Sequence, residues 1–186
     1  MGLLKIIKKA KEKHSEIRIV IVGLDNAGKS SLVTRLLDKP LDQVAPTLGF
    51  KIYTYPYKNY NLNIWDIGGQ KSIRSFWKNY FHDTDGLIWV VDSADRQRIN
   101  DCKVEFQKLL CNEHLTETPV LVLANKQDIP GAMTADDISK AIGIDKLSHR
   151  YKILPTSALD TAIDSTRVYN LADCISFLLE TNKNKT

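Results

Sequence analysis

Two short stretches of the sequence, residues 85–92 (DGLIWVVD) and 118–125 (TPVLVLAN), are almost continuously apolar. A strand with one face in water alternates apolar and polar side chains, whereas a parallel strand covered by helices on both faces does not. Other segments read as further strands and helices, and they alternate along the chain: strand-like at 17–23, 50–57, 60–66 and 152–158, and helix-like at 29–39, 96–110 and 166–181. This order predicts an α/β fold with the two apolar stretches as central strands.

The size of the chain predicts one domain. Its 186 residues can bury a single core without disulfides or structural metals. No apolar run approaches the about 18 residues that span a bilayer. The three cysteines lie far apart, match no Cys-x-x-Cys spacing and follow no signal peptide, which favours a cytoplasmic location. We expect the main domain at residues 16–181, after a helical segment at 1–15 and before a disordered tail at 182–186.

The excess of positive over negative charge is confined to the N-terminal end of the chain. The net charge is +4, and residues 1–18 contain six basic and two acidic side chains, which leaves twenty of each sign in the rest. A groove for nucleic acid requires positive charge spread over the folded body. The distribution therefore argues against nucleic acid as a partner.

Residues 23–30 (GLDNAGKS) match the pattern Gly-x-x-x-x-Gly-Lys-Ser/Thr and lie between a strand and a helix, as a phosphate-binding loop requires. The glycines let backbone N–H groups surround phosphate oxygens, at the positive end of the next helix. Lys29 is expected to reach the β- and γ-phosphates and Ser30 to bind Mg²⁺. The alternative is a glycine-rich turn with a surface lysine. The candidate phosphate-binding residues are Gly23, Asp25, Asn26, Ala27, Gly28, Lys29, Ser30, Ser31 and Gly69.

Residues 125–128 (NKQD) directly follow the second apolar stretch, at the sheet edge where ligands of open α/β folds bind. The carboxylate of Asp128 can accept two hydrogen bonds from guanine, from its ring N–H and its amino group, a geometry that adenine does not offer. Lys126 would lie along the base, Asn125 would brace the loops, and the backbone N–H of Ala158 would meet the guanine carbonyl. Ser157, directly before Ala158, is a further candidate for the guanine site. Alone, this segment could equally be a polar turn at a strand end.

Two further segments supply candidates for the metal and the chemistry. A hydroxyl at Thr47 could complete the shell of Mg²⁺, although it could equally be a turn threonine. Asp66 would reach the metal through water and Gly69 would donate its N–H to a γ-phosphate. Gln70 is the catalytic candidate, because its amide can donate and accept at once and so orient a water molecule. As a weak base it predicts slow hydrolysis of GTP, with an arginine supplied by a partner for fast turnover.

The segments GLDNAGKS, PTLGF, WDIGGQ, NKQD and SA, in this order and spacing, resemble the ADP-ribosylation-factor branch of the Ras-like GTPases. The resemblance covers nearly the whole chain and implies a six-stranded, mostly parallel sheet with helices on both faces. It also implies an exchange factor, an activating protein, and effectors that include a tubulin-folding cofactor and carriers of lipidated proteins, with possible cytoskeletal association. The effector surface would include Phe50, Trp65 and Tyr80, of which the last two could instead be core residues.

The chain departs from the family pattern in two places. The segment 159–170 is longer than the short glycine-containing turn of the family, which affects the start of the last helix and the nearby base loop. Ser30 and Ser31 replace a more usual pair of threonines, which keeps the hydroxyl ligand.

The N-terminal segment reads as a small amphipathic helix, with apolar residues on about half of its circumference. The resemblance implies that this helix is docked on the domain in the GDP form and released in the GTP form. Leu3, Leu4 and Ile7 would then bind a groove on a partner protein. Weak, transient contact with a membrane surface and a merely solvated helix are the alternatives. Gly2 invites N-myristoylation, but the pattern requires Ser or Thr where this chain has Ile6.

Together these patterns favour a monomeric switch that binds GTP or GDP with Mg²⁺. A nucleotide-bound scaffold that does not cycle is the main rival. A phosphate-loop kinase of small substrates is a third interpretation. The sequence has no recognisable lid segment that would bind a phosphate acceptor, and the NKQD segment conflicts with this interpretation.

Overall fold

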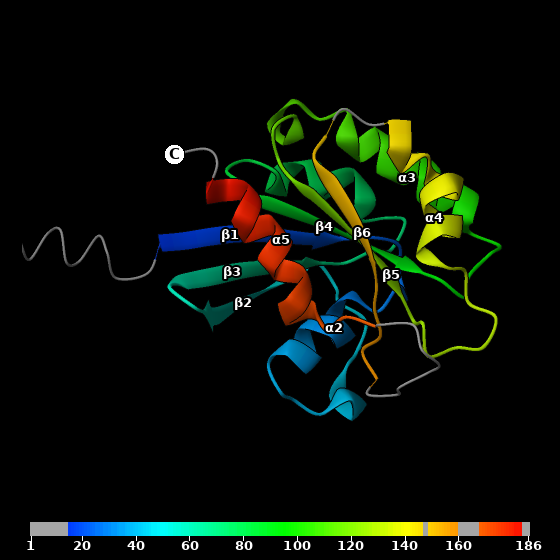
Figure 1. The fold of residues 1–186 in the computed structure, drawn as a ribbon, viewed down its shortest axis with the longest axis horizontal. Helices are drawn as coiled ribbons and strands as arrows, with labels where there is room; N and C mark the ends of the chain where they lie inside the picture. Colours follow the sequence, from blue (N-terminus) through cyan, green and yellow to red (C-terminus); the bar gives the residue numbers. More distant parts are fainter. Residues whose placement is uncertain (1–14, 147–148, 160–167, 184–186) are drawn as a thin grey trace, which may run out of the picture.

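The computed structural model describes residues 15–146, 149–159 and 168–183. Within them one sheet has the strand order β2-β3-β1-β4-β5-β6, and only the β2–β3 pair is antiparallel (Figure 1). The strands are β1 (Ser15–Val22), β2 (Phe50–Tyr57), β3 (Tyr60–Ile67), β4 (Gly86–Asp92), β5 (Val120–Asn125) and β6 (Tyr151–Pro155). This confirms the predicted six-stranded, mostly parallel α/β fold.

The two apolar stretches form β4 and β5, and both lie inside the sheet with a parallel neighbour on each side. Every residue of β5 is buried, and β4 is buried up to its last residue, Asp92. Because helices cover both faces here, the side chains of both faces are buried up to Asp92, and the alternating pattern is lost.

The helices divide between the two faces of the sheet. Figure 1 shows α5 (Leu171–Lys183) across one face, where it packs with α2 (Lys29–Leu36) on side chains such as Ile19 and Val90. On the other face, α3 (Ile99–Leu110), α4 (Ala135–Ile142) and the 3₁₀ segment η2 (Arg74–Tyr80) pack on side chains such as Trp89. Three shorter 3₁₀ segments are η1 (Leu41–Gln43), η3 (Glu113–Leu115) and η4 (Ile144–Lys146).

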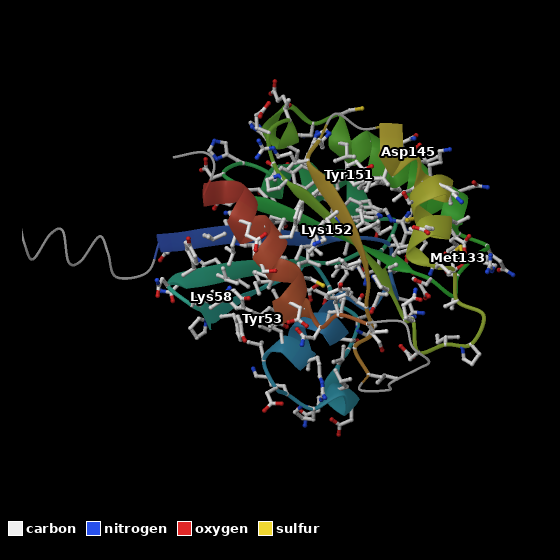
Figure 2. The ribbon with its side chains drawn as sticks, in the orientation of Figure 1. Tyr53, Lys58, Met133, Asp145, Tyr151 and Lys152 are labelled. Atoms are coloured by element: carbon white, nitrogen blue, oxygen red, sulfur yellow. The ribbon has the colours of Figure 1, made fainter. Side chains whose placement is uncertain are left out.

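The sheet has β2 at one edge and β6 at the other. Figure 2 labels Tyr53 and Lys58 at the first edge, and Tyr151 and Lys152 at the second. The β2–β3 hairpin turns over residues 58–59, and Lys58 adopts a left-handed φ of 53° there. The register pairs Phe50 with Ile67, which brings the end of the loop that carries Thr47 beside the start of the loop that carries Gln70.

Helix α4 is an element that the sequence analysis missed. Thr134 caps it: its hydroxyl accepts the Asp137 N–H at 3.1 Å, and the Asp137 carboxylate accepts the Thr134 N–H at 3.0 Å. This reciprocal capping box satisfies two N–H groups that have no partner within a helix. The Thr-x-x-Asp spacing was the signal that could have revealed α4.

The last helix begins later than predicted. The segment 166–181 was expected to be helical, but α5 starts at Leu171, because Tyr169 pairs its N–H with the Pro155 carbonyl at 3.0 Å and forms a bridge to Thr156. The Asn170 side chain then accepts the Asp173 N–H at 2.9 Å, as an N-cap does. At its other end α5 runs to Lys183, two residues into the predicted tail.

The N-terminal helix predicted at residues 1–15 lies outside the described residues, except that Ser15 already belongs to β1. None of the helices in the described ranges has the length and apolarity that a membrane crossing requires.

Candidate functional site

The phosphate loop connects β1 to α2 and its backbone requires unusual dihedral angles. Gly28 has a φ of 89°, and a Cβ at this position would collide with the amide nitrogen of Asn125. Asn26 adopts a φ of 61°, a left-handed value that asparagine tolerates better than most residues. The loop therefore folds as its motif predicts, and it lies against the candidate base loop.

The ammonium group of Lys29 is held inside this loop. Its Nζ donates to the Gly23 carbonyl at 3.0 Å and to the Leu24 carbonyl at 2.8 Å, and the residue is 5% exposed. Burial lowers the pKa of Lys29 to about 8, against the pull of nearby Asp66 and Asp25. A buried cation with few compensating charges is suited to an anionic ligand. The alternative of a surface lysine does not agree with this burial.

Ser30, Thr47 and Asp66 meet at one point, from three separate segments. The Ser30 hydroxyl lies 2.8 Å from the Thr47 hydroxyl and donates to Asp66 Oδ2 at 2.6 Å. Thr47 also donates to Asp66 Oδ2 at 3.3 Å, and Thr47 is 5% exposed. The reading of Thr47 as a simple turn residue does not account for this contact with the other two side chains.

These three side chains fit a magnesium ion. Hydroxyl and carboxylate oxygens are the ligands that Mg²⁺ prefers. Asp66 is fully buried, and its Oδ1 has no hydrogen-bond partner among the described residues. Burial raises the pKa of Asp66, although hydrogen bonds from Ser30 and the charge of Lys29 oppose the shift. A cation at this point would relieve the cost of the buried carboxylate.

One cleft joins the predicted phosphate and metal residues. It has a volume of about 480 Å³ and is lined by the phosphate loop from Asp25 to Ser31, by residues 44–47 and by residues 68–70. Gln70 lies on this lining, and its Oε1 is buried without a hydrogen-bond partner within the described residues. An amide oxygen in this condition can accept a hydrogen bond from a water molecule in the cleft.

The candidate base residues form a second group beside the phosphate loop. Asn125 donates from Nδ2 to the Ala27 carbonyl at 2.8 Å, a contact that links the phosphate loop to the candidate base loop. The Ser157 hydroxyl donates to Asp128 Oδ1 at 2.5 Å, which fixes the carboxylate. Lys126, with a φ of 66°, forms an ion pair with Asp92 at 2.7 Å. Ala158 follows at the end of this group and is partly buried.

The three aromatic residues predicted on the effector surface are in contact. Phe50 stacks on Trp65 with ring centroids 5.4 Å apart, and it meets Tyr80 at 5.2 Å. The Arg18 guanidinium lies 3.9 Å from the Trp65 ring centroid. Trp65 and Tyr80 are half-buried on the core, while Phe50 is 45% exposed, so the trio is intermediate between core and surface. The residues Leu3 and Leu4 lie outside the described residues.

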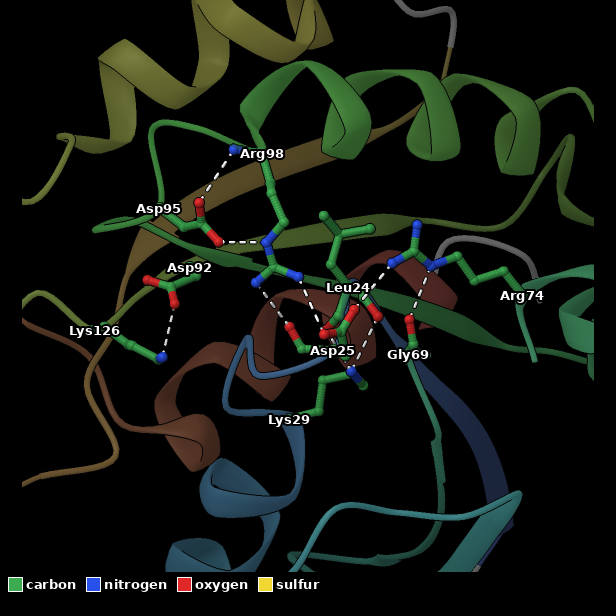
Figure 3. Close-up of polar contacts among 10 residues, drawn as sticks. Leu24, Asp25, Lys29, Gly69, Arg74, Asp92, Asp95, Arg98 and Lys126 are labelled. Atoms are coloured by element: carbon green, nitrogen blue, oxygen red, sulfur yellow. Dashed lines mark hydrogen bonds and ion pairs between the residues drawn. The ribbon is translucent and has the colours of Figure 1, made fainter. Parts of the chain in front are cut away.

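A cluster of ion pairs beside the phosphate loop was not foreseen from the sequence. Arg74 of η2 and Arg98, directly before α3, both donate to the carboxylate of Asp25, and Arg98 also pairs with Asp95 at 2.5 Å (Figure 3). Burial would raise the pKa of Asp95, but hydrogen bonds from Arg98 lower it below its usual value. No spacing in the sequence indicates the contacts of Asp25, because both arginines come from segments far from it along the chain.

Comparisons with known proteins agree with the geometry. The sequence of residues 3–173 matches a protein-family model described as "ADP-ribosylation factor family". ADP-ribosylation factor-like protein 2 of Arabidopsis thaliana is 52% identical over 160 residues, which are 85% of this chain and 86% of that protein. ADP-ribosylation factor-like protein alp41 of Schizosaccharomyces pombe is 45% identical over 179 residues, 96% of this chain and 92% of that protein.

A solved structure matches the fold over most of its length. The Arl6 BBS3 small GTPase from Trypanosoma brucei, with the bound nucleotide analogue GppNp, has a TM-score of 0.81 and 28% identity. The match covers 92% of this chain and 100% of that chain.

Proposed function

The chain belongs to the ADP-ribosylation factor family of small GTPases, and on that premise we propose that it is a timed switch. It binds GDP or GTP, engages effectors in the GTP form, and hydrolyses GTP slowly with a water molecule positioned by Gln70. The observation that carries this proposal is the single cleft in which Lys29, Thr47 and Gln70 meet.

The phosphates would lie on the loop from Gly23 to Ser31, with Lys29 against the β- and γ-phosphates. Ser30 and Thr47 would hold Mg²⁺ directly and Asp66 would hold it through water. When bound, the ion would neutralise charge on the phosphates. Thr47 comes from a different segment than Ser30, so a ligand shared by both hydroxyls would draw that segment onto the nucleotide.

In the proposed reaction, the oxygen of a water molecule bonds to the γ-phosphorus while the bond to the β–γ bridging oxygen breaks. GDP leaves with that electron pair, and the proton of the water passes to the released phosphate. Gln70 Oε1, which has no hydrogen-bond partner in the described part of the chain, would accept a hydrogen bond from the water, and the Gln70 amide nitrogen would donate toward the phosphoryl group. Both arginines next to the loop are bound to Asp25, which supports an activating protein as the source of the accelerating arginine.

Guanine would be selected by Asp128, whose carboxylate is oriented by Ser157 before any base arrives. Lys126 would lie along the base, and the Ala158 N–H would meet the guanine carbonyl. Adenine has no pair of N–H donors to offer this partly buried carboxylate, and a charged acceptor left unpaired costs binding free energy, so adenine would be rejected by this geometry.

Effectors would bind the surface around Phe50, Trp65 and Tyr80. Three neighbouring apolar side chains are also exposed, Leu48 at 84%, Ile52 at 48% and Phe76 at 55%. Exposed apolar groups next to a nucleotide-dependent loop favour a protein partner. We further propose that Leu3 and Leu4 contribute, that the chain acts as a cytoplasmic monomer, and that an exchange factor, a tubulin-folding cofactor and carriers of lipidated proteins are among its partners.

Fluorescent mant-GDP and mant-GTP binding with ATP as competitor, together with single-turnover hydrolysis of GTP, tests the proposal. We expect guanine-only binding and slow hydrolysis that Gln70→Leu reduces at least about tenfold, because leucine can neither donate nor accept. Binding without hydrolysis in the unaltered protein would favour a scaffold. Effective competition by ATP would remove the role given to Asp128.

A further inference from the structure

The carboxylate of Asp25, in the first half of the phosphate loop, is shared by two arginines. Arg74 donates to Asp25 Oδ1 at 3.0 Å and Arg98 donates to Oδ2 at 3.2 Å. Arg98 also donates to the Asp25 carbonyl at 3.2 Å, and Figure 3 shows the two guanidinium groups approaching from opposite sides. Each oxygen of this carboxylate therefore has its own cationic partner.

Arg74 also holds the segment that carries the catalytic candidate. Its Nε donates to the Gly69 carbonyl at 2.8 Å, and the Arg74 side chain is only 11% exposed. The Gly69 carbonyl and the Gln70 N–H belong to one planar peptide unit. A hydrogen bond that fixes this carbonyl therefore fixes the orientation from which the Gln70 side chain leaves the backbone.

Gly69 is also in close contact with the phosphate loop itself. A Cβ on Gly69 would collide with the Asp25 nitrogen and the Gly23 carbonyl, so only glycine allows this approach. Its position thus depends on two supports: backbone contact with the loop, and the bond from Arg74, whose other end is fixed on Asp25. A charge-assisted bond shielded from water is the stronger kind of hydrogen bond.

We propose that Arg74, anchored on Asp25, is a positioning residue for GTP hydrolysis: it holds the Gly69–Gln70 peptide so that Gln70 faces the attacking water, and it keeps the Gly69 backbone in place beside a γ-phosphate. This inference rests on the proposed roles of Gly69 and Gln70. Only GTP has a γ-phosphate, so loss of Arg74 loosens the contact with GTP and leaves the contact with GDP unchanged.

Arg98 has a lesser part in the same arrangement. Its guanidinium is fixed by Asp95, which lies in the turn between β4 and α3, so it holds Asp25 from the side away from Gly69. Without Arg98, the bond from Arg74 to Gly69 would remain. The expected order of effects on hydrolysis is therefore Arg74 first and Arg98 second.

Arg74→Gln tests the proposal through three measurements: single-turnover hydrolysis of GTP, dissociation of mant-GppNp and dissociation of mant-GDP. We expect hydrolysis to slow by about tenfold to a hundredfold, since misplaced groups lose that much rate. Dissociation of mant-GppNp should be severalfold faster, and dissociation of mant-GDP unchanged. Arg74→Lys should recover only part of the rate, because an ammonium group lacks the fork that reaches Asp25 and Gly69 together.

A matched control is Arg96→Gln, which removes an exposed arginine two residues before Arg98 that donates to the Gly131 carbonyl at 3.3 Å. It should keep the rates of the unaltered protein. Asp25→Asn combined with Arg74→Gln should slow hydrolysis less than the product of the two single effects, since both act through one contact.

Two results would overturn the proposal. If Arg74→Gln hydrolyses GTP at the normal rate while Gln70→Leu does not, Arg74 does not position the catalytic peptide and the timed switch still stands. If Arg74→Gln releases both nucleotides faster and melts at a lower temperature, its role is structural only. Failure of the proposed function would differ from both, because the unaltered protein would then show no hydrolysis dependent on Gln70.

Discussion

At the scale of single residues, Asp128, the proposed guanine-binding carboxylate, is held in place by neighbouring groups of the protein. Its Oδ1 accepts the Ser157 hydroxyl at 2.5 Å, and that hydroxyl in turn accepts the Leu159 N–H at 3.0 Å. The carboxylate is therefore oriented by a chain of hydrogen bonds that does not involve the base. Such preorganisation lowers the entropy cost of binding.

Asp128→Asn should weaken GDP binding by at least about 30-fold, which corresponds to about 2 kcal/mol for the loss of a charged acceptor and the mismatch of an amide N–H against guanine donors. Competition against mant-GDP measures this loss. Asp136→Asn, on the exposed first turn of α4, is the control and should bind normally. Equal affinity in the two variants would show that Asp128 does not read the base.

The sequence could place the phosphate loop, residues 68–70 and the segment after Asn125 together, because they follow β1, β3 and β5 and the carboxyl ends of parallel strands meet at one edge of a sheet. Thr47 precedes β2 and was proposed from its hydroxyl alone. The sequence could not predict the partners of Asp25. Arg74 and Arg98 lie 49 and 73 residues away from Asp25, and contacts between distant polar side chains leave no periodic pattern. The details of the ion-pair cluster thus required the structure.

At the scale of elements, strands were easier to predict than short helices. The strand at 50–57 was predicted with its observed bounds, since it lies between clear turn signals. Helix α4 has only eight residues, of which Ile138 and Ile142 are the buried apolar ones, too few to establish a helical period. The start of α5 was misplaced because Tyr169 pairs with Pro155, and this tertiary contact overrides the apolar spacing.

Thr134→Ala should destabilise the protein by about 1 kcal/mol, because it leaves an N–H at the start of α4 without its acceptor. Chemical denaturation with the same nucleotide in both samples measures this change. Asp137→Ala breaks the other half of the capping box, so the double variant should lose less than the sum of the two. Lys140→Ala, an exposed change on the same helix, should stay within about 0.5 kcal/mol, and a larger loss there than at Thr134 would contradict the capping argument.

At the scale of the whole molecule, the cleft lies where three segments that flank neighbouring strands of the sheet come together. Residues 44–47 precede β2 at the edge of the sheet, the phosphate loop follows β1, and residues 68–70 follow β3. A nucleotide with its metal would bridge all three. Asp66 lies behind this lining, bonded to Ser30 and Thr47, and it is fully buried. Its Oδ1 has no hydrogen-bond partner in the described part of the chain, so without a cation the burial of this carboxylate lowers the stability of the fold.

Removal of magnesium should therefore lower the stability of the nucleotide complex as a whole. Ligand at about 100 times its Kd stabilises a protein by about 2.7 kcal/mol. For a chain of this size this corresponds to a rise in Tm of roughly 5 to 10 °C. We expect GTP with Mg²⁺ to give such a rise and GTP with EDTA to give a clearly smaller one, because Asp66 and the phosphates then face one another without the ion.

Ser30→Ala removes one proposed metal ligand, so its GTP complex should gain little stability from Mg²⁺. The Tm of this variant with GTP should therefore be nearly the same with Mg²⁺ and with EDTA. Ser139→Ala, on α4 and far from the cleft lining, should keep the full response to the chelator. A thermal shift that is equal with and without EDTA in the unaltered protein would mean that the buried Asp66 is compensated by the protein alone. The meeting of Ser30, Thr47 and Asp66 would then serve only to hold residues 44–47 against α2.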